Sequence, residues 1–247
     1  MAAINYDDAV AVSGDIYWVG YYDQEANLHC NPYLLIDEQD VVLFDPGSIP
    51  YFPKIMRKVI DLVDPSSITA IVISHQDPDV CGSLAVLEEV IERTDTKIIA
   101  HTNTIRLIRH YGLKSQYYPV DEHEFRYTLP SGRILQFLYT PYLHSPGAIM
   151  TYDITSKSLF TSDVFGAIAD NWSLFATGDN LEPMKDWHQA YMPSNSLLKE
   201  CMQRLEQMDI HRILPQHGSI FEKENIPDAI NYLKHLPCGL DLKNQNL

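Results

Sequence analysis

The sequence is poor in basic residues. It has 18 Lys and Arg against 33 Asp and Glu, which gives a formal net charge of −15. A chain this acidic repels phosphate backbones, so we expect no nucleic-acid partner. The acidity also has a second explanation, because carboxylates are ligands that many metal ions prefer.

Cysteine is scarce and shows no paired motif. Cys30, Cys81, Cys201 and Cys238 include no two residues in a Cys-x-x-Cys arrangement, which argues against a zinc ribbon and a thioredoxin-like site. Two disulfides are compatible with the number alone. Free and buried thiols are the more common state in a domain of this size, and we expect them here.

Long apolar runs are absent as well. No run reaches the roughly 20 residues that span a bilayer, and residues 1–13 have neither the basic region nor the apolar core of a signal peptide. We therefore expect a cytoplasmic protein without a membrane segment. At 247 residues, with 45% hydrophobic and 21% charged residues, the composition is that of a globular protein. No linker or repeat divides it, so the sequence predicts one domain over residues 1–247.

Short β-rich runs are interspersed with amphipathic stretches. Strands are expected over residues 16–20, 33–36, 41–44, 68–73, 97–100, 126–139 as a hairpin, 148–154, 158–161 and 212–215. Helices are expected over 82–92, 102–109, 186–208 and 226–235, and in a stretch that places Ile55, Val59, Ile60 and Val63 on one face. Hairpins with helices between them indicate sheets packed on sheets with helices outside.

The strongest local signal is a loop with three potential metal ligands at alternate positions. His75, Asp77 and Asp79 follow the apolar run 68–73 and precede the helix that is expected from Gly82. Loops at strand ends can hold reactive groups on a rigid sheet. By itself the segment is also compatible with a polar turn in which Asp79 caps the helix.

Three further strands end in metal-competent side chains. His144, Asp163 and His217 each stand just past a predicted strand, beside a small or turn-forming residue. A single His or Asp in such a place is more often a cap or a satisfied polar group. Four strand ends that all carry such residues indicate a shared metal site.

The order of these motifs resembles the metallo-β-lactamase superfamily. It runs His-x-Asp-x-Asp, His-Ser-Pro-Gly, a strand-ending Asp and a Pro-x-His-Gly turn, and the resemblance extends over residues 16–221. The segment Val-Leu-Phe-Asp-Pro-Gly at 42–47 resembles an early strand and turn of that superfamily. The resemblance implies an α/β (α+β) fold, a four-layer αββα sandwich, with two metals at one edge of the sheets.

The resemblance also implies a ligand set. The implied ligands are His75, Asp77 and His144 for metal one, Asp79 and His217 for metal two, and Asp163 as the bridge. In sites of this type the metals lie about 3.5–4 Å apart. Zinc hydrolases of the superfamily usually have His-x-His-x-Asp-His, whereas Asp77 and Val80 stand here where two of those histidines would be.

An acidic residue at the position of Asp77 is typical of the flavodiiron proteins, whose segments around 162–166 and 191–218 are also similar. Those proteins reduce dioxygen or nitric oxide with electrons from a fused flavodoxin-like domain. Mixed His and carboxylate sites with open positions suit non-haem iron. Zinc accepts many ligand sets and is the alternative metal.

Two departures from the flavodiiron pattern narrow the resemblance. The chain ends at Leu247 without a flavin domain, and Val80 removes a nitrogen ligand. In both respects the sequence resembles stand-alone oxygen-binding di-iron proteins, which are associated with oxygen sensing. This implies two iron ions (Fe2+/Fe3+) with a bridging oxo, hydroxo or peroxo ligand, and dioxygen bound by the diferrous centre. Val80 fits either an apolar filler or an apolar wall beside an open coordination position.

Other functions and partners stay open at this point. The chain could reduce oxygen or nitric oxide with electrons from an external flavoprotein or rubredoxin, or hydrolyse a substrate with a zinc-bound hydroxide. The loss of two imidazoles argues against the hydrolase, and the complete ligand set argues against a metal-free binding module. A sensor would need a signalling partner, and the flavodiiron resemblance implies a homodimer. No catalytic residue and no further cofactor ligand is assigned.

Several residues are candidates for support of the site. His29 could hydrogen-bond a bound ligand or lie in a surface turn. Acceptors for the ring N–H groups of the histidines are expected among Ser74, Thr140 and Asp45. An aromatic lid or dimer contact, or more simply core packing, is expected of Trp172, Phe175, Trp187 and Tyr191. Cys81 should point into the core, and surface or core positions without a metal role are expected for His101, His110, His123, His188, His211 and His235.

Overall fold

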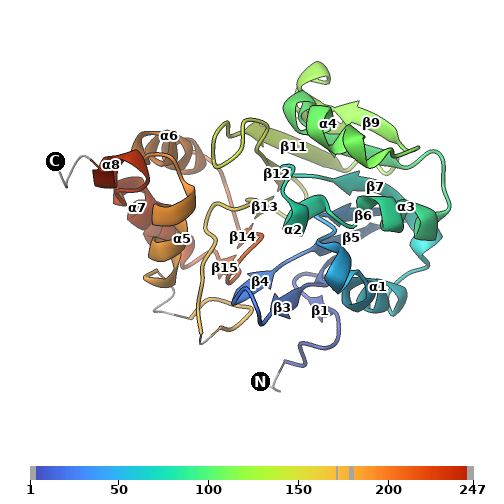
Figure 1. Ribbon diagram of the computed structural model, residues 1–247, viewed down its shortest axis with the longest axis horizontal. Helices are drawn as coiled ribbons and strands as arrows, with labels where there is room; N and C mark the ends of the chain where they lie inside the picture. Colours follow the sequence, from blue (N-terminus) through green and yellow to red (C-terminus); the bar gives the residue numbers. More distant parts are fainter. Residues whose placement is uncertain (1–3, 171, 178–180, 244–247) are drawn as a thin grey trace.

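Two large β-sheets lie face to face in the middle of the molecule (Figure 1). The computed structural model describes residues 4–170, 172–177 and 181–243. In spatial order, the strands of the seven-stranded sheet are β1 (Val10–Ala11), β2 (Ile16–Trp18), β5 (Tyr33–Asp37), β6 (Asp40–Phe44), β7 (Ile68–Val72), β8 (Lys97–Ala100) and β9 (Gln116–Pro119).

The second sheet has six strands in sequence order. They are β10 (Arg126–Thr128), β11 (Ile134–Tyr139), β12 (Ile149–Asp153), β13 (Ser158–Phe160), β14 (Arg212–Leu214) and β15 (Phe221–Glu222). Adjacent strands are antiparallel except β13 and β14, which are parallel. A separate hairpin is formed by β3 (Tyr21–Asp23) and β4 (Leu28–Cys30).

Helices cover both outer faces of the sheet pair (Figure 1). Beside the first sheet lie α1 (Phe52–Ile60), α2 (Pro78–Cys81), α3 (Leu84–Ile91) and α4 (Thr102–Ile108). Beside the second sheet lie α5 (Pro183–Tyr191), α6 (Asn195–Leu205), α7 (Ile226–His235) and α8 (Leu240–Lys243). Short 3-10 helices are η1 (Ile49–Tyr51), η2 (Pro65–Ser67), η3 (Arg109–Tyr111) and η4 (Val120–Glu122). Within the described ranges, no helix combines the length and the apolar character that crossing a membrane requires.

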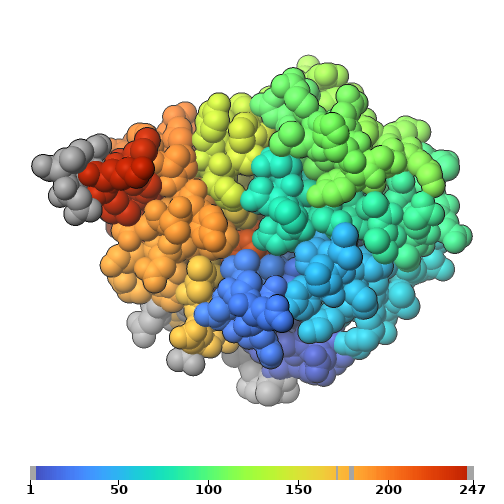
Figure 2. Space-filling view, viewed as in Figure 1, coloured from blue at the N-terminus to red at the C-terminus, as the bar shows by residue number. Residues whose placement is uncertain are grey.

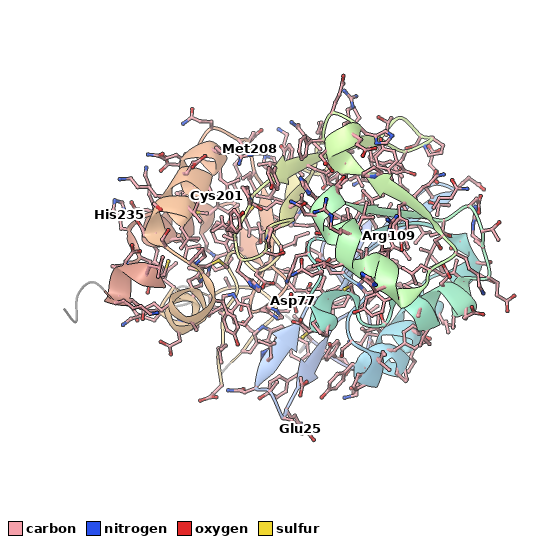
Figure 3. The ribbon with its side chains drawn as sticks, turned by 45° about the horizontal axis from the view of Figure 1, so that its top comes forward. Glu25, Asp77, Arg109, Cys201, Met208 and His235 are labelled. Atoms are coloured by element: carbon pink, nitrogen blue, oxygen red, sulfur yellow. The ribbon has the colours of Figure 1, made fainter. Side chains whose placement is uncertain are left out.

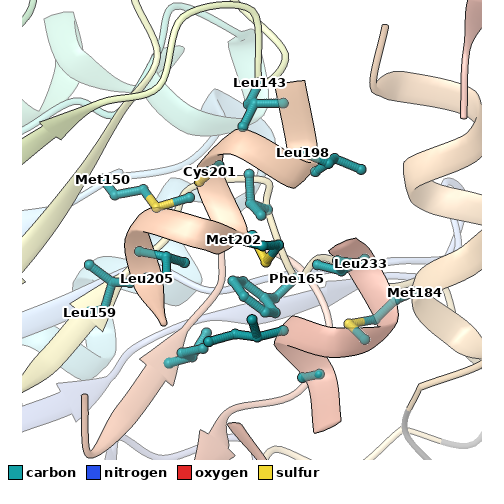
Figure 4. Close-up of a cluster of buried hydrophobic side chains, with 14 of the residues drawn as sticks. Leu143, Met150, Leu159, Phe165, Met184, Leu198, Cys201, Met202, Leu205 and Leu233 are labelled. Atoms are coloured by element: carbon teal, nitrogen blue, oxygen red, sulfur yellow. The ribbon is translucent and has the colours of Figure 1, made fainter. Parts of the chain in front are cut away.

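Three hydrophobic clusters hold these layers together. Between the sheets, Phe44 of β6 stacks on Phe160 of β13 with ring centroids 3.8 Å apart. One outer cluster packs α1, α3 and α4 on the first sheet. The other packs α5, α6 and α7 on the second sheet, and Figure 4 shows side chains of this cluster, Phe165 and Leu233 among them. The expected αββα sandwich is therefore confirmed. All four cysteines are free and buried, as expected.

Three expectations about the elements were wrong in detail. Ile60 was expected on the buried face of α1, but it is the last residue of that helix and is 57% exposed. Met56 is buried beside Ile55 instead. The reason is that the apolar face follows the helical repeat from residue 55. The helix expected over 186–208 is divided into α5 and α6 around Pro193, since proline lacks the N–H that a continuous helix needs. Strand β14 is followed by a further strand, β15, which pairs with it.

A buried ion cluster joins the two sheets. Arg133 precedes β11 in the second sheet, and its guanidinium forms a two-pronged ion pair with Asp153 at the end of β12. It also contacts Asp37 of β5 in the first sheet and Asp15, which directly precedes β2. Arg133 is 7% exposed and Asp153 is fully buried. The cluster lies at the starts of β11 and β13. The opposite ends of these two strands take no part in it.

We predict that Arg133→Leu lowers the free energy of unfolding by about 3–5 kcal/mol, because it leaves the buried carboxylate of Asp153 without its counter-charge. Urea denaturation followed by circular dichroism measures the change. The matched control is Arg93→Leu, which removes the surface ion pair with Asp95 and should change the stability little. Equal effects of the two substitutions would show that the cluster does not bind the sheets together.

Candidate metal centre

The carboxyl ends of four strands meet at one edge of the sandwich. His75 follows β7, His144 follows β11, Asp163 follows β13 and His217 follows β14. Asp77 lies near the middle of the molecule, between the two halves, in the view with side chains (Figure 3). The structure brings all six predicted ligands together.

One group of donors consists of His75, Asp77 and His144. Their ligand atoms all lie within 4.8 Å of one another. Oδ2 of Asp77 is 3.6 Å from Nε2 of His75 and 3.5 Å from Nε2 of His144. This group corresponds to the predicted site of metal one.

A second group contains Asp79 and His217. Oδ2 of Asp79 lies 3.2 Å from Nε2 of His217. Sγ of Cys30 belongs to the same group, since it and the ligand atoms of Asp79 and His217 lie within 4.8 Å of one another. Sequence reasoning assigned Asp79 and His217 to metal two and overlooked Cys30, because a lone cysteine beside a strand carries no recognisable motif.

Asp163 lies between the two groups. Its Oδ2 is 2.6 Å from Nε2 of His144 and 3.6 Å from Nε2 of His75. Its Oδ1 is 3.6 Å from Nε2 of His217. Each carboxylate oxygen therefore faces a different group, which is the arrangement that a bridging ligand requires.

Two buried atoms in the site indicate that it fits a pair of cations. Oδ1 of Asp163 and Nε2 of His217 are buried and have no hydrogen-bond partner. A buried polar group that is left unpaired costs about 1–3 kcal/mol, and more when it is charged. Metal ions bound to these atoms would remove that cost, and three imidazoles with three carboxylates form a donor set suited to divalent metals.

The pKa values of these groups reflect their mutual attraction. Burial alone would lower the pKa of His75, but Asp163 and Asp77 raise it to about 9. Burial alone would raise the pKa of Asp163, but the imidazoles of His75, His144 and His217 hold it well below the usual value. Without metal, the raised pKa of His75 favours its protonated form beside these carboxylates, and a metal ion that binds to this ring must displace that proton.

Neighbouring polar groups orient the histidine rings. The hydroxyls of Ser74 and Ser162 lie 3.2 and 3.0 Å from Nδ1 of His75. Asp45 accepts a hydrogen bond of 2.8 Å from the backbone N–H of Ser74. Ser74 thus contacts the ring of His75, as expected, whereas Asp45 bonds to the backbone of Ser74 and not to a ring. Ser162 was missed although it directly precedes Asp163. The expectation for Thr140 is not met, because its hydroxyl donates to the carbonyl of Ala148.

His217 is oriented by the backbone of the β3–β4 hairpin. Its Nδ1–H donates to the carbonyl of His29 over 2.9 Å, which leaves Nε2 free to face Asp79. Gly218 follows with φ of +80°, and a Cβ there would lie 2.9 Å from the backbone N of Ala167. Only glycine fits this turn without strain. The turn therefore fixes the direction in which His217 points.

The ring of His29 lies in a stack of aromatic side chains. It is stacked between Tyr22 and Trp172, with ring centroids 4.3 and 4.1 Å away. Burial, followed by repulsion from His217, lowers its pKa to about 4. The carbonyl of His29 accepts the hydrogen bond from His217, and Nδ1 of its own ring is buried without a hydrogen-bond partner among the described residues.

Two of the four aromatic candidates border the site. The indole N–H of Trp187 donates to the carbonyl of Asp163 over 2.9 Å, and its ring lies 4.5 Å from that of His217. Tyr191 lies 5.9 Å from the ring of His144 and is 49% exposed. Trp172 and Phe175 pack in the cluster between the sheets. Core packing therefore accounts for most of this set, and Tyr191 alone combines exposure with contact to a candidate ligand.

Two neighbours of the ligand loop pack into the core. Val80 is fully buried in the cluster beneath α1 and α3, which fits an apolar filler. Cys81 is buried as expected, and its thiol donates to the carbonyl of Asp77. Among the histidines expected to have no metal role, His188 is fully buried and bonded to the backbones of Phe165 and Met184.

The site is open on one side. The side chains of Asp77 and Asp79 are 34% and 35% exposed, whereas those of His75, Asp163 and His217 are at most 2% exposed. In the space-filling view, the teal segment with α2, the blue β3–β4 hairpin and the orange segment around α5 meet in the middle of the visible face (Figure 2). Small molecules can therefore reach the carboxylates of Asp77 and Asp79 and the ring of His144, which is 19% exposed, while the rings of His75 and His217 are enclosed.

We predict that Asp163→Ala reduces the bound metal from two ions per chain to at most one, because the substitution removes the atoms that face both donor groups. Elemental analysis after anaerobic loading and desalting measures the ratio. Asp228→Ala, an exposed aspartate in α7, is the control and should keep both ions. Full occupancy of two sites in Asp163→Ala would refute the ligand assignment.

Comparison with known proteins identifies related chains. The model of the family described as "ODP family beta lactamase" matches residues 28–218. Two structures of the chemotaxis sensor ODP are 25% identical: a peroxy diiron species, with a TM-score of 0.82 over 97% of this chain and 99% of that one, and the apo state from T. denticola, with 0.81 over 97% and 98%.

Curated relatives are longer proteins. A flavo-diiron protein of Clostridium acetobutylicum is 27% identical over 204 residues, which cover 79% of this chain and 50% of the relative. An anaerobic nitric oxide reductase flavorubredoxin of Pectobacterium carotovorum is 30% identical over 171 residues, which cover 64% of this chain and 33% of the relative. The chain thus spans about half or less of the length of these two relatives.

Proposed function

Because the chain belongs to the ODP family of β-lactamase-like proteins, we propose that it is a di-iron protein that binds dioxygen and serves as an oxygen sensor or carrier. The observation that carries the proposal is the donor set. Three imidazoles and three carboxylates surround Asp163, and Asp77 stands between His75 and His144 with 3.5–3.6 Å to each ring.

Iron held by these six side chains would supply electrons and an open coordination position to dioxygen, which the side chains themselves cannot provide. The surroundings determine access and charge. The enclosed side, with Trp187 against His217, excludes bulk water, and the exposed Asp77 and Asp79 leave an entrance for a small molecule. Three carboxylates favour the higher oxidation state of bound iron more than neutral imidazoles would. Zinc has no redox chemistry and is the alternative occupant.

The first test is exposure of the anaerobic, iron-loaded protein to air. We expect a new visible charge-transfer band, at a ratio of two iron ions per chain by elemental analysis. The Asp163→Ala variant, treated in the same way, should lack the band. Iron-loaded protein without any new band, or protein that retains only zinc from an iron-rich anaerobic preparation, would contradict the proposal.

Reduction of oxygen or nitric oxide is the second candidate function, and the flavo-diiron and flavorubredoxin relatives favour it. Such a reductase would take electrons from an external flavoprotein or rubredoxin. Steady-state consumption of NADH with a flavoprotein reductase and rubredoxin separates the two functions. We expect slow consumption that does not depend on the di-iron protein. Rapid turnover that disappears in Asp163→Ala would instead support the reductase.

A sensor also requires a signalling protein that responds to the state of the centre. The homodimer, the cytoplasmic location and the single-domain organisation over residues 1–247 stay predictions.

A further inference from the structure

The ligand loop, residues 75–80, supplies two donors to the first group but only Asp79 to the second. At the first group, His75 and His144 lie near Oδ2 of Asp163, and Asp77 lies near both rings. At the second group, His217 lies near Oδ1 of Asp163, and Asp79 lies near His217. Val80, the residue after Asp79, has a hydrocarbon side chain that is buried in the core. The loop therefore supplies no further donor to the second group from that position.

Cys30 lies beside this group. It ends β4, is 2% exposed, and its Sγ is within 4.8 Å of ligand atoms of both Asp79 and His217. A metal ion lies roughly 2.0–2.3 Å from nitrogen, oxygen or sulfur ligands, so two donors on one ion are at most about 4.6 Å apart. Small side-chain shifts would be enough to close the three groups on one ion.

A buried ring nitrogen points to the same place. Nε2 of His217 forms no hydrogen bond with the described residues, although Oδ2 of Asp79 lies 3.2 Å away. It cannot exchange roles with Nδ1, because Nδ1 donates to the carbonyl of His29. The strand that orients His217 through His29 thus offers a thiol from its next residue, Cys30.

The strand end with Cys30 is bound firmly to the turn with His217. The backbone N–H of Asn31 donates to the carbonyl of Gln216 over 2.8 Å. The side-chain amide of Asn31 donates to the carbonyls of Pro215 and Gly218 over 3.0 and 2.9 Å. These bonds flank Cys30 and His217, so their proximity is built into the backbone and does not depend on flexible side chains.

We propose that Cys30 binds metal two as a thiolate, together with Asp79, His217 and the bridging Asp163. The assignment rests on the proposed metal pair and adds a sulfur ligand to it. Soft thiolate ligands are readily accepted by iron, zinc and cobalt. The other thiols are placed differently. Cys81 donates to a backbone carbonyl, and Cys201 lies in the helical layer among Leu198, Met202 and other apolar side chains (Figure 4).

Cobalt(II) substitution tests the proposal, because it reports on sulfur ligation without any activity. The metal-free protein is titrated anaerobically with cobalt(II), and the absorption spectrum is recorded. We expect visible d–d bands from both sites and a near-ultraviolet sulfur-to-cobalt charge-transfer band. Cys30→Ser should lose the charge-transfer band and keep d–d bands from the first site. Cys201→Ala and Cys81→Ser, which remove thiols elsewhere, should keep the charge-transfer band.

Affinity gives an independent measurement. Removal of groups that only orient metal ligands commonly costs 10–100-fold in affinity, so loss of a direct ligand should weaken binding of the second cobalt ion by at least about 10-fold. Isothermal titration of wild-type protein, Cys30→Ser and Cys201→Ala measures this, and the first ion should bind equally well in all three. Circular dichroism establishes that each variant is folded. If Cys30→Ser does not fold, the other three proteins test the proposal. A charge-transfer band in the wild type that persists in Cys81→Ser and Cys201→Ala supports Cys30 as the sulfur ligand.

The outcomes separate the two proposals. Two bound cobalt ions without a charge-transfer band in the wild type would overturn the role of Cys30 and leave the metal pair intact. Loss of the band in Cys81→Ser, or its persistence in Cys30→Ser, would also overturn it. Failure of the wild type to bind cobalt would contradict the metal centre itself.

Discussion

The contact of one buried carboxylate with three imidazoles is the interaction on which the site depends. Asp163 is 2% exposed and lies between His75, His144 and His217, each of which comes from a different strand end. Burial of a carboxylate is costly unless positive charge or hydrogen-bond donors surround it. The sheets must therefore meet with all four ends at the correct depth, because a displaced strand would leave Asp163 or its partners uncompensated.

The rest of the sandwich provides this precision. The core between the sheets, with Phe44 stacked on Phe160, sets the spacing of the two layers. The Arg133 cluster joins the sheets at the starts of β11 and β13, and the candidate ligands follow the opposite ends of those strands. Rigid elements hold a metal site better than flexible loops, since ligands must be held within fractions of an ångström. The stability of the fold and the geometry of the site are thus coupled.

Small substitutions within one fold are expected to separate related functions, because function depends on the site and not on the architecture. Asp77 adds a carboxylate between two imidazoles, and Val80 directs a hydrocarbon side chain into the core. The β3–β4 hairpin lies against the second donor group. The carbonyl of His29 accepts from His217, and the thiol of Cys30 lies beside Asp79 and His217. A hairpin outside the two large sheets therefore orients one residue of this half of the site, His217.

The sequence by itself determined the elements and the residues at their ends. Apolar runs that stop at His75, Asp163 and His217 are local features, so strand ends and six candidate ligands could be predicted from them, with help from the family resemblance. Only the tertiary structure decided which oxygen of Asp163 faces which group, and that Cys30 lies beside His217. Such contacts join segments up to 188 residues apart. They depend on how the sheets and the hairpin pack, which no local pattern encodes.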